Sequence, residues 1–222
     1  MSNSILLLIV CTVFSCGGAS PGNRPVAGED SGEQIPVPEG WQSLICSNAL
    51  DGWEIIRYGG EGEPYVRNGV LTLPMAVNGS LTGVRKTGDV PTNNYTMTLE
   101  ARRINGNDFF LGLTFPYNDT FATFIAGGWG GSVCGLSSID GYDASENETT
   151  GHIHFKNRQW YPVCLRVTPD SIRISIDTMK AVSIGTAGKK IHLRPGSSAS
   201  APLGLSTYLT TGEIRNIFLK KE

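Results

Sequence analysis

The sequence has no surplus of either charge. Its 222 residues include 18 Lys and Arg against 20 Asp and Glu, which gives a formal net charge of −2. A general nucleic-acid-binding protein would show an excess of basic residues, so we expect no nucleic-acid partner. No Cys-x-x-Cys pair is present, which argues against a thiolate zinc site. A serine elbow, a phosphate-binding loop and a dinucleotide fingerprint are also missing.

Long hydrophobic runs are scarce. The run "SILLLIVCTVF" near the N-terminus is about eleven residues long, which suits the core of a signal peptide and is too short to span a bilayer. The following "VFSCGG" resembles a bacterial lipobox, in which the cysteine becomes lipidated; ordinary signal cleavage is the alternative. We therefore predict a signal peptide over residues 1–16, lipidation of Cys16, export to the periplasm or cell surface, and anchoring in an envelope membrane.

Large apolar residues are nearly absent from residues 17–40, which are rich in Gly, Pro, Ser and acids. Such a segment cannot bury enough surface to order itself, so we predict a flexible linker there and a folded domain over residues 41–222. The folded part holds Cys46, Cys134 and Cys164. Three cysteines allow at most one disulfide, with three choices of pair, and we otherwise expect buried thiols.

No window of a dozen residues has the apolar period of an amphipathic helix. From Trp41 onward the apolar residues instead alternate with polar ones, as in "NYTMTLEARR" and "SIRISID". Turn signals such as "RNG", "NGN" and "TTG" separate about twelve to fourteen such segments. The sequence therefore predicts an all-β protein, a jelly-roll β-sandwich of two antiparallel sheets.

Several segments resemble the bacterial 3-keto-disaccharide hydrolase domain. They are "GWQSLICSNALDGWEI", "VRNGVLTL", "NNYTMTLEARRINGNDFFLGLTF", "RQWYPVCLRVTPDSIRISID" and "LGLSTYLTTGEIRNIFLKK", which together extend from about Trp41 to Lys221. The resemblance implies a concanavalin A-like jelly roll and action on 3-oxidised glycosides. Three features depart from the family pattern: Asn107-Asp108-Phe109 replaces "NSG", Asp177-Thr178 replaces a His- or Asn-containing strand end, and a glycine-rich insert precedes residue 140.

The acids Asp140, Asp143, Glu146 and Glu148 crowd into one stretch. Three interpretations remain open. The stretch can be a solvated loop whose side chains bond their own backbone. It can supply catalytic groups, with Glu146 as acid or base and Asp143 as its partner. It can also hold a hard cation such as Ca²⁺ on Asp140, Asp143 and Glu146, since carboxylates and loop carbonyls suit that ion.

Candidate sugar-binding residues lie on both sides of this stretch. In "GGWGG" the glycines leave the indole of Trp129 exposed for stacking on a pyranose, although a core tryptophan at a bulge is the alternative. His152 and His154 share one face of a strand and suit substrate or metal contacts, while paired surface histidines are commoner.

Further candidates precede the glycine-rich segment. Asp108 falls at the family's "NSG" position and is a third catalytic candidate. Arg102 and Glu100 share a polar strand face that is expected to line the same groove, and Arg85 ends another strand. Cross-strand ion pairs are the alternative for each of these charged residues.

Two functions follow from these observations. The first is acid–base cleavage of a 3-keto-glycoside, and the second is a non-catalytic glycan-binding module with Ca²⁺ as a candidate ion. A structural envelope domain without a sugar site is a third alternative. Carbohydrate is the expected partner under the first two.

Overall fold

The computed structural model describes residues 35–194 and 196–222. The predicted signal peptide, the lipidation site at Cys16 and linker residues 17–34 lie outside the described residues. Within the described part, no helix is long and apolar enough to cross a membrane.

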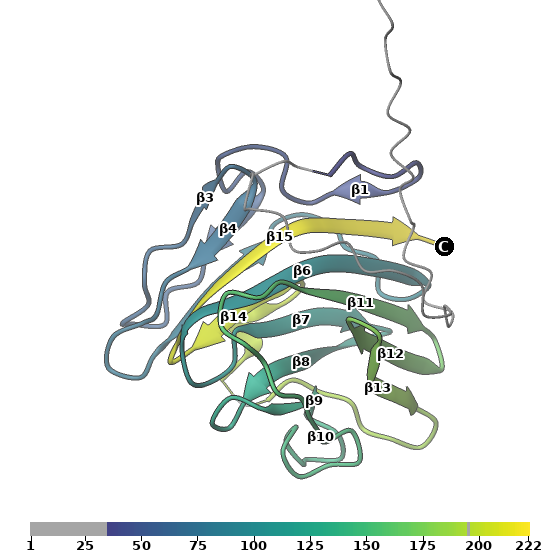
Figure 1. Cartoon of the computed structure of the whole chain (residues 1–222). Helices are drawn as coiled ribbons and strands as arrows, with labels where there is room; N and C mark the ends of the chain where they lie inside the picture. The colour runs from purple at the N-terminus through teal and green to yellow at the C-terminus, as the bar shows by residue number, and fades with distance from the viewer. Residues whose placement is uncertain (1–34, 195) are drawn as a thin grey trace, which may run out of the picture.

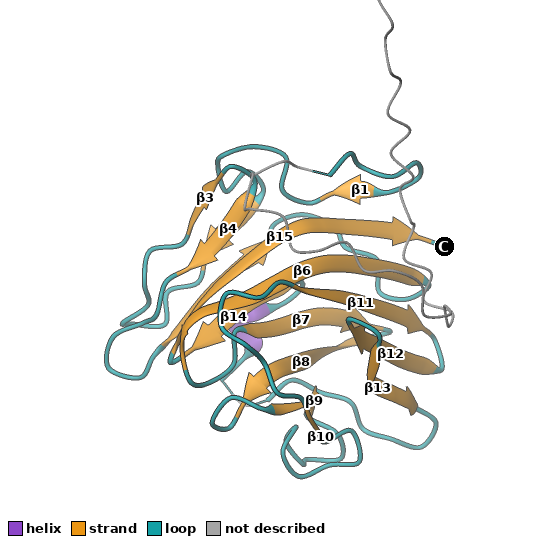
Figure 2. Ribbon diagram, viewed as in Figure 1, coloured by secondary structure: helices purple, strands orange, loops and turns teal. Residues whose placement is uncertain are grey.

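Two antiparallel sheets stack face to face, as Figures 1 and 2 show. The eight-stranded sheet has the order β13 (Met179–Gly185), β12 (Ser171–Ile176), β11 (Tyr161–Thr168), β6 (Tyr95–Gly106), β15 (Thr210–Lys221), β4 (Val70–Leu73) and β3 (Tyr65–Arg67), and β1 (Gln42–Ser43) also pairs with β15. The seven-stranded sheet has the order β10 (Gly151–His152), β9 (Val133–Ser137), β8 (Thr120–Gly128), β7 (Leu111–Tyr117), β14 (Gly204–Tyr208), β5 (Leu81–Lys86) and β2 (Trp53–Ile55). The one helical element, the 3₁₀ turn η1 (Ser198–Ser200), precedes β14 within the described residues.

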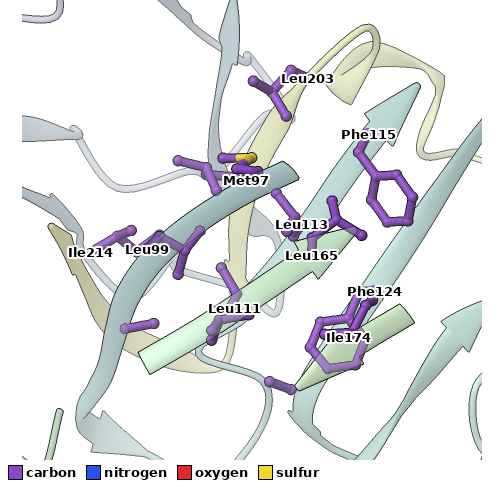
Figure 3. Packing of buried hydrophobic residues seen from close by; sticks show 14 of the residues in the cluster. Met97, Leu99, Leu111, Leu113, Phe115, Phe124, Leu165, Ile174, Leu203 and Ile214 are labelled. Atoms are coloured by element: carbon purple, nitrogen blue, oxygen red, sulfur yellow. The ribbon is translucent and has the colours of Figure 1, made fainter. Parts of the chain in front are cut away.

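The core lies between the sheets and follows from the period-two alternation. Leu99 of β6 and Leu165 of β11 face Leu113 of β7 and Phe124 of β8, and all four are nearly fully buried (Figure 3). Successive side chains of a strand point to opposite faces, so alternate residues of each sheet remain on its outer face. The predicted all-β sandwich of two antiparallel sheets is confirmed.

The cysteines agree with expectation in part. Cys46 and Cys134 are free thiols, so none of the three pairings among Cys46, Cys134 and Cys164 is formed. Cys134 is buried as expected, but Cys46 is exposed because it follows the short edge strand β1 rather than lying within a strand.

Candidate functional site

A pocket of about 470 Å³ opens on the outer face of the seven-stranded sheet. Small polar side chains form much of its floor because the outward positions of β7, β8 and β9 are Thr114, Thr123 and Ser137, which lie side by side in the register. The hydroxyls of Thr114 and Thr123 are 2.9 Å apart and form a hydrogen bond. The complete lining is Leu81, Asp108, Phe109, Thr114, Thr123, Ile125, Trp129, Ser137, Arg194, Gly196, Ser197, Ser200, Ser206 and Tyr208.

One wall of the pocket carries aromatic side chains from the strand ends. Trp129, in the β8–β9 connection, is 42% exposed. Phe109 and Tyr208 stack with ring centroids 6.0 Å apart. Asp108 ties this wall together: its Oδ1 accepts from the N–H of Phe109 at 2.8 Å, and its Oδ2 accepts from the N–H of Gly130 at 3.3 Å. The wall therefore presents a half-exposed indole on a connection whose backbone is bound by the Asp108 carboxylate.

The opposite wall comes from the connection between β13 and β14, residues 186–194 and 196–203, which we call the strap. It contributes Arg194, Gly196, Ser197 and Ser200 to the lining. Its end lies close against β14, since a Cβ on Gly204 would be 2.4 Å from the carbonyl oxygen of Ser200. The hydroxyl of Ser200 also bonds that of Tyr58 at 2.9 Å. The strap thus encloses a side of the pocket that would otherwise be open sheet.

The acidic stretch, residues 138–150, holds the strap in place. Asp143 accepts from the Ser137 hydroxyl and from the N–H of Ala144 at 2.8 Å, and its Oδ2 lies 3.1 Å from Nε of Arg194. Asp140 Oδ1 accepts from the N–H of Lys190 at 2.8 Å. Glu148 forms an ion pair with Lys189. Backbone bonds between Ser138 and His192 complete this contact.

Because the acids of this stretch bond different partners, their positions bear on the cation and catalytic interpretations. Asp140, Asp143 and Glu146 do not gather around a common point, and no group of three or more His, Cys, Asp or Glu suited to a metal occurs among the described residues. Glu146 is exposed and does not line the pocket. Asn147 fixes the loop shape, with Nδ2 donating to the carbonyls of Leu136 at 2.7 Å and Asp143 at 2.8 Å.

The two histidines also lie outside the pocket lining. His152 and His154 are exposed at and just beyond β10, on the edge of the seven-stranded sheet. Nδ1 of His152 is 3.4 Å from the hydroxyl of Ser132.

The expectation that Arg102 and Glu100 line one groove with Asp108 does not hold for this pocket. Both are on β6 and face outward from the eight-stranded sheet, with the core between them and the pocket. Arg102 pairs with Glu213 at 2.6 Å and lies over the ring of Trp160 at 4.3 Å. Glu100 pairs with Arg215 at 2.7 Å.

Arg85 does lie on the outer face of the seven-stranded sheet, as an expected cross-strand pair with Glu54 at 2.8 Å. Arg85 pairs in the strand register with Gly204, the residue against which Ser200 of η1 packs. Arg85 is not part of the pocket lining. The ion pair with Glu54 therefore explains the position of the Arg85 side chain.

Sequence reasoning missed Arg103, which is 6% exposed beneath the Trp129 loop. Its Nη2 donates to the carbonyl of Gly131 at 2.8 Å. Burial lowers the pKa of Arg103 and the charge of Asp108 acts in the opposite sense. A signal was available, because the alternation that points Leu99 and Ala101 inward also points residue 103 inward.

No protein-family model matches the chain, and no curated protein matches its sequence. Solved structures do match. A candidate glycosyl hydrolase from Parabacteroides distasonis is 13% identical with a TM-score of 0.51, and the alignment covers 83% of this chain and 95% of that one. A carbohydrate-binding module from Bacillus subtilis is 11% identical with a TM-score of 0.52, covering 76% and 95%. A non-specific endo-beta-1,3(4)-glucanase of family GH16 is 10% identical with a TM-score of 0.53, covering 86% and 95%. At these identities the likeness shows the fold alone, and that fold is the concanavalin A-like jelly-roll β-sandwich that the sequence predicts.

Proposed function

We propose that this domain binds a carbohydrate in the pocket of the seven-stranded sheet, with Trp129 as the stacking platform. The observation that carries the proposal is a half-exposed indole on the wall of a pocket whose floor is lined by hydroxyls. The flat face of an indole suits the apolar face of a pyranose, and Ser and Thr hydroxyls can exchange hydrogen bonds with sugar hydroxyls. The similar structures named for glycan hydrolysis or binding support this ligand class.

The arrangement favours binding over acid–base catalysis of glycoside hydrolysis. Most glycosidases place two carboxyl groups on either side of the scissile bond. Among the described lining residues Asp108 is the one carboxylate, and both of its oxygens already accept backbone hydrogen bonds. Asp143 stands behind the lining, held by Ser137 and Arg194.

Cleavage of a 3-keto-glycoside is the second candidate, because it needs one base rather than two flanking carboxylates. A carbonyl at C3 acidifies the C2–H bond. A base, for which Asp108 is the candidate here, removes that proton, the electron pair forms the C1=C2 double bond, and the C1–O bond breaks. The leaving oxygen takes that proton back from the carboxyl group of Asp108, which restores the base, and departs as the alcohol; water then adds across the double bond. The resemblance of the chain to the 3-keto-disaccharide hydrolase domain and the position of Asp108 in the pocket favour this candidate.

A printed oligosaccharide array tests the binding proposal. We expect the wild-type domain to bind a subset of glycans and Trp129→Ala to lose about thirtyfold in affinity, since a buried aromatic contact contributes about 2 kcal/mol to binding. Tyr142→Ala is the matched control, because Tyr142 is also an exposed aromatic residue, at 60% against 42% for Trp129, and it lies outside the pocket lining. Equal binding by wild type and Trp129→Ala would refute the stacking role.

A chromogenic substrate separates the two candidates. The second candidate requires release of p-nitrophenol from p-nitrophenyl 3-keto-glucoside and its loss in Asp108→Asn. Binding to the array without any release identifies a binding module, while release that Asp108→Asn retains excludes Asp108 as the base.

We also propose that the chain is exported and held at an envelope membrane through lipid on Cys16, as the sequence indicates. Fractionation of cells that express the full chain tests this. Wild type should be found in the membrane fraction and Cys16→Ser in the soluble fraction, and equal distribution of the two would contradict lipidation at Cys16.

A further inference from the structure

We propose that Arg103 is a positioning residue that fixes the indole of Trp129 at the pocket wall from beneath. The inference rests on the proposed function, since it assigns Arg103 a role in presenting the sugar platform. It concerns the loop Gly127–Gly131, which comprises the end of β8 and the start of the turn to β9 and carries Trp129, and two charged residues that contact this loop, Arg103 of β6 and Asp108 of the β6–β7 connection.

Arg103 and Asp108 bind the loop from two sides. From inside, Nη2 of Arg103 donates to the carbonyl of Gly131 at 2.8 Å and approaches that of Gly127 at 3.5 Å. On the pocket side, Asp108 accepts from the N–H of Gly130 at 3.3 Å. One guanidinium therefore contacts both the first and the last residue of the loop, and Trp129 lies between these residues in the chain.

The loop backbone needs such support. Trp129 has a φ of 48°, in the left-handed region that a large side chain rarely adopts. Gly127, at φ 80°, has no room for a side chain, since a Cβ there would lie 2.6 Å from Nη2 of Arg103. Strained backbone persists where its surroundings hold it, and here those surroundings are the guanidinium and the carboxylate of Asp108.

Stability of the sandwich does not explain an arginine at this position. The residue is 6% exposed, its Nε has no hydrogen-bond partner, and no carboxylate forms an ion pair with it among the described residues. Its guanidinium lies 5.4 Å from the ring of Phe110. A buried charge without an ion-pair partner is costly, and the charge of Asp108 offsets that cost only in part, since burial still lowers the pKa of Arg103. An apolar side chain of similar length would fill the same space without that cost. The carbonyls of the Trp129 loop are the groups that an apolar side chain could not bind.

Fluorine NMR of protein labelled with fluorotryptophan tests the proposal without a ligand. Trp129→Phe assigns the Trp129 resonance among the four tryptophans. We expect that resonance to broaden or split in Arg103→Met, with the other three unchanged. Arg166→Met is the matched control, because Arg166 also has a buried Nε without a partner but lies on the opposite sheet, where it pairs with Glu222.

The binding readout then follows for the glycan with the highest affinity on the array. Arg103→Met should bind about tenfold or more weakly than wild type, with a melting temperature within a few degrees of it. The affinity of Arg103→Lys should lie between those of wild type and Arg103→Met. An ammonium keeps the charge but cannot span both carbonyls as the guanidinium does.

The outcomes separate this proposal from the proposed function. A sharp, unshifted Trp129 resonance in folded Arg103→Met overturns it. If Arg103→Met does not fold, Arg103→Lys carries the same test, and loss of folding in both variants places Arg103 in the scaffold and overturns it too. If wild type binds no glycan but the resonance responds as expected, the positioning role stands and the carbohydrate function fails.

Discussion

The guanidinium of Arg194 and the carboxylate of Asp143 lie 3.1 Å apart (Nε to Oδ2) and join the acidic stretch to the strap. The same carboxylate accepts the Ser137 hydroxyl at the edge of the pocket floor. The crowded acids of residues 138–150 therefore attach a wall of the pocket to the edge of the seven-stranded sheet. Among the described residues, the acids of this stretch do not gather into a cation site, and none of residues 138–150 lines the pocket.

Asp143→Ala should lower the free energy of unfolding by about 1–3 kcal/mol, because the Ser137 hydroxyl and the Ala144 N–H lose their acceptor. Arg194→Ala should cost less than about 1 kcal/mol, since this arginine is mostly exposed. Glu146→Ala, in the same loop but exposed, is the control and should stay within about 0.5 kcal/mol of wild type. Urea denaturation measures all three. Equal losses in Asp143→Ala and Glu146→Ala would contradict this account of the loop.

Gly204→Ala should destabilise the domain by about 1–3 kcal/mol, because a Cβ there would lie 2.4 Å from the carbonyl oxygen of Ser200. Relief requires η1 to move away from β14, which opens the strap side of the pocket. The control is Gly185→Ala: its Cβ would meet nothing within 4 Å, and its backbone is not left-handed. Thermal unfolding followed by circular dichroism compares the two. A Gly204→Ala protein as stable as Gly185→Ala would show that the strap is not packed against the sheet.

Glu61 makes stability depend on pH. Hydrogen bonds from its own N–H and that of Gly60 lower the pKa of Glu61 from 4.5 to about 2. A carboxyl group with a depressed folded-state pKa contributes stability above its unfolded pKa and loses that contribution as pH falls through the folded value. The melting temperature of wild type should therefore exceed that of Glu61→Gln at pH 6, and the difference should shrink between about pH 4.5 and pH 2. A difference that stays constant down to pH 2 would contradict the shift.

The sequence predicted the sandwich well because period-two alternation is a local property. "NYTMTLEARR" and "SIRISID" became β6 and β12 with the expected buried faces. The alternation says which residues share a face but not which sheet receives a strand. Glu100 and Arg102 therefore seemed to share a groove with Asp108, although β6 and β7 belong to different sheets.

The strap shows a second reason why the site was harder to predict than the fold. Lys190 bonds Asp140 across 50 residues of sequence, and no local pattern encodes such a contact. Arg103 was different: an arginine at an inward position of a regular strand is a break in the pattern, and such breaks are expected at functional sites.

The most direct test of the central claim is a fluorine NMR titration of the fluorotryptophan-labelled domain with the oligosaccharide that binds best on the array. Trp160 is the internal control, because it lies against the opposite sheet, where the guanidinium groups of Arg102 and Arg215 are 4.3 Å and 4.1 Å from its ring. Saturable displacement of the Trp129 resonance with an unchanged Trp160 resonance is the predicted result. Displacement of Trp160 with Trp129 unchanged would place the sugar on the other sheet and contradict the account.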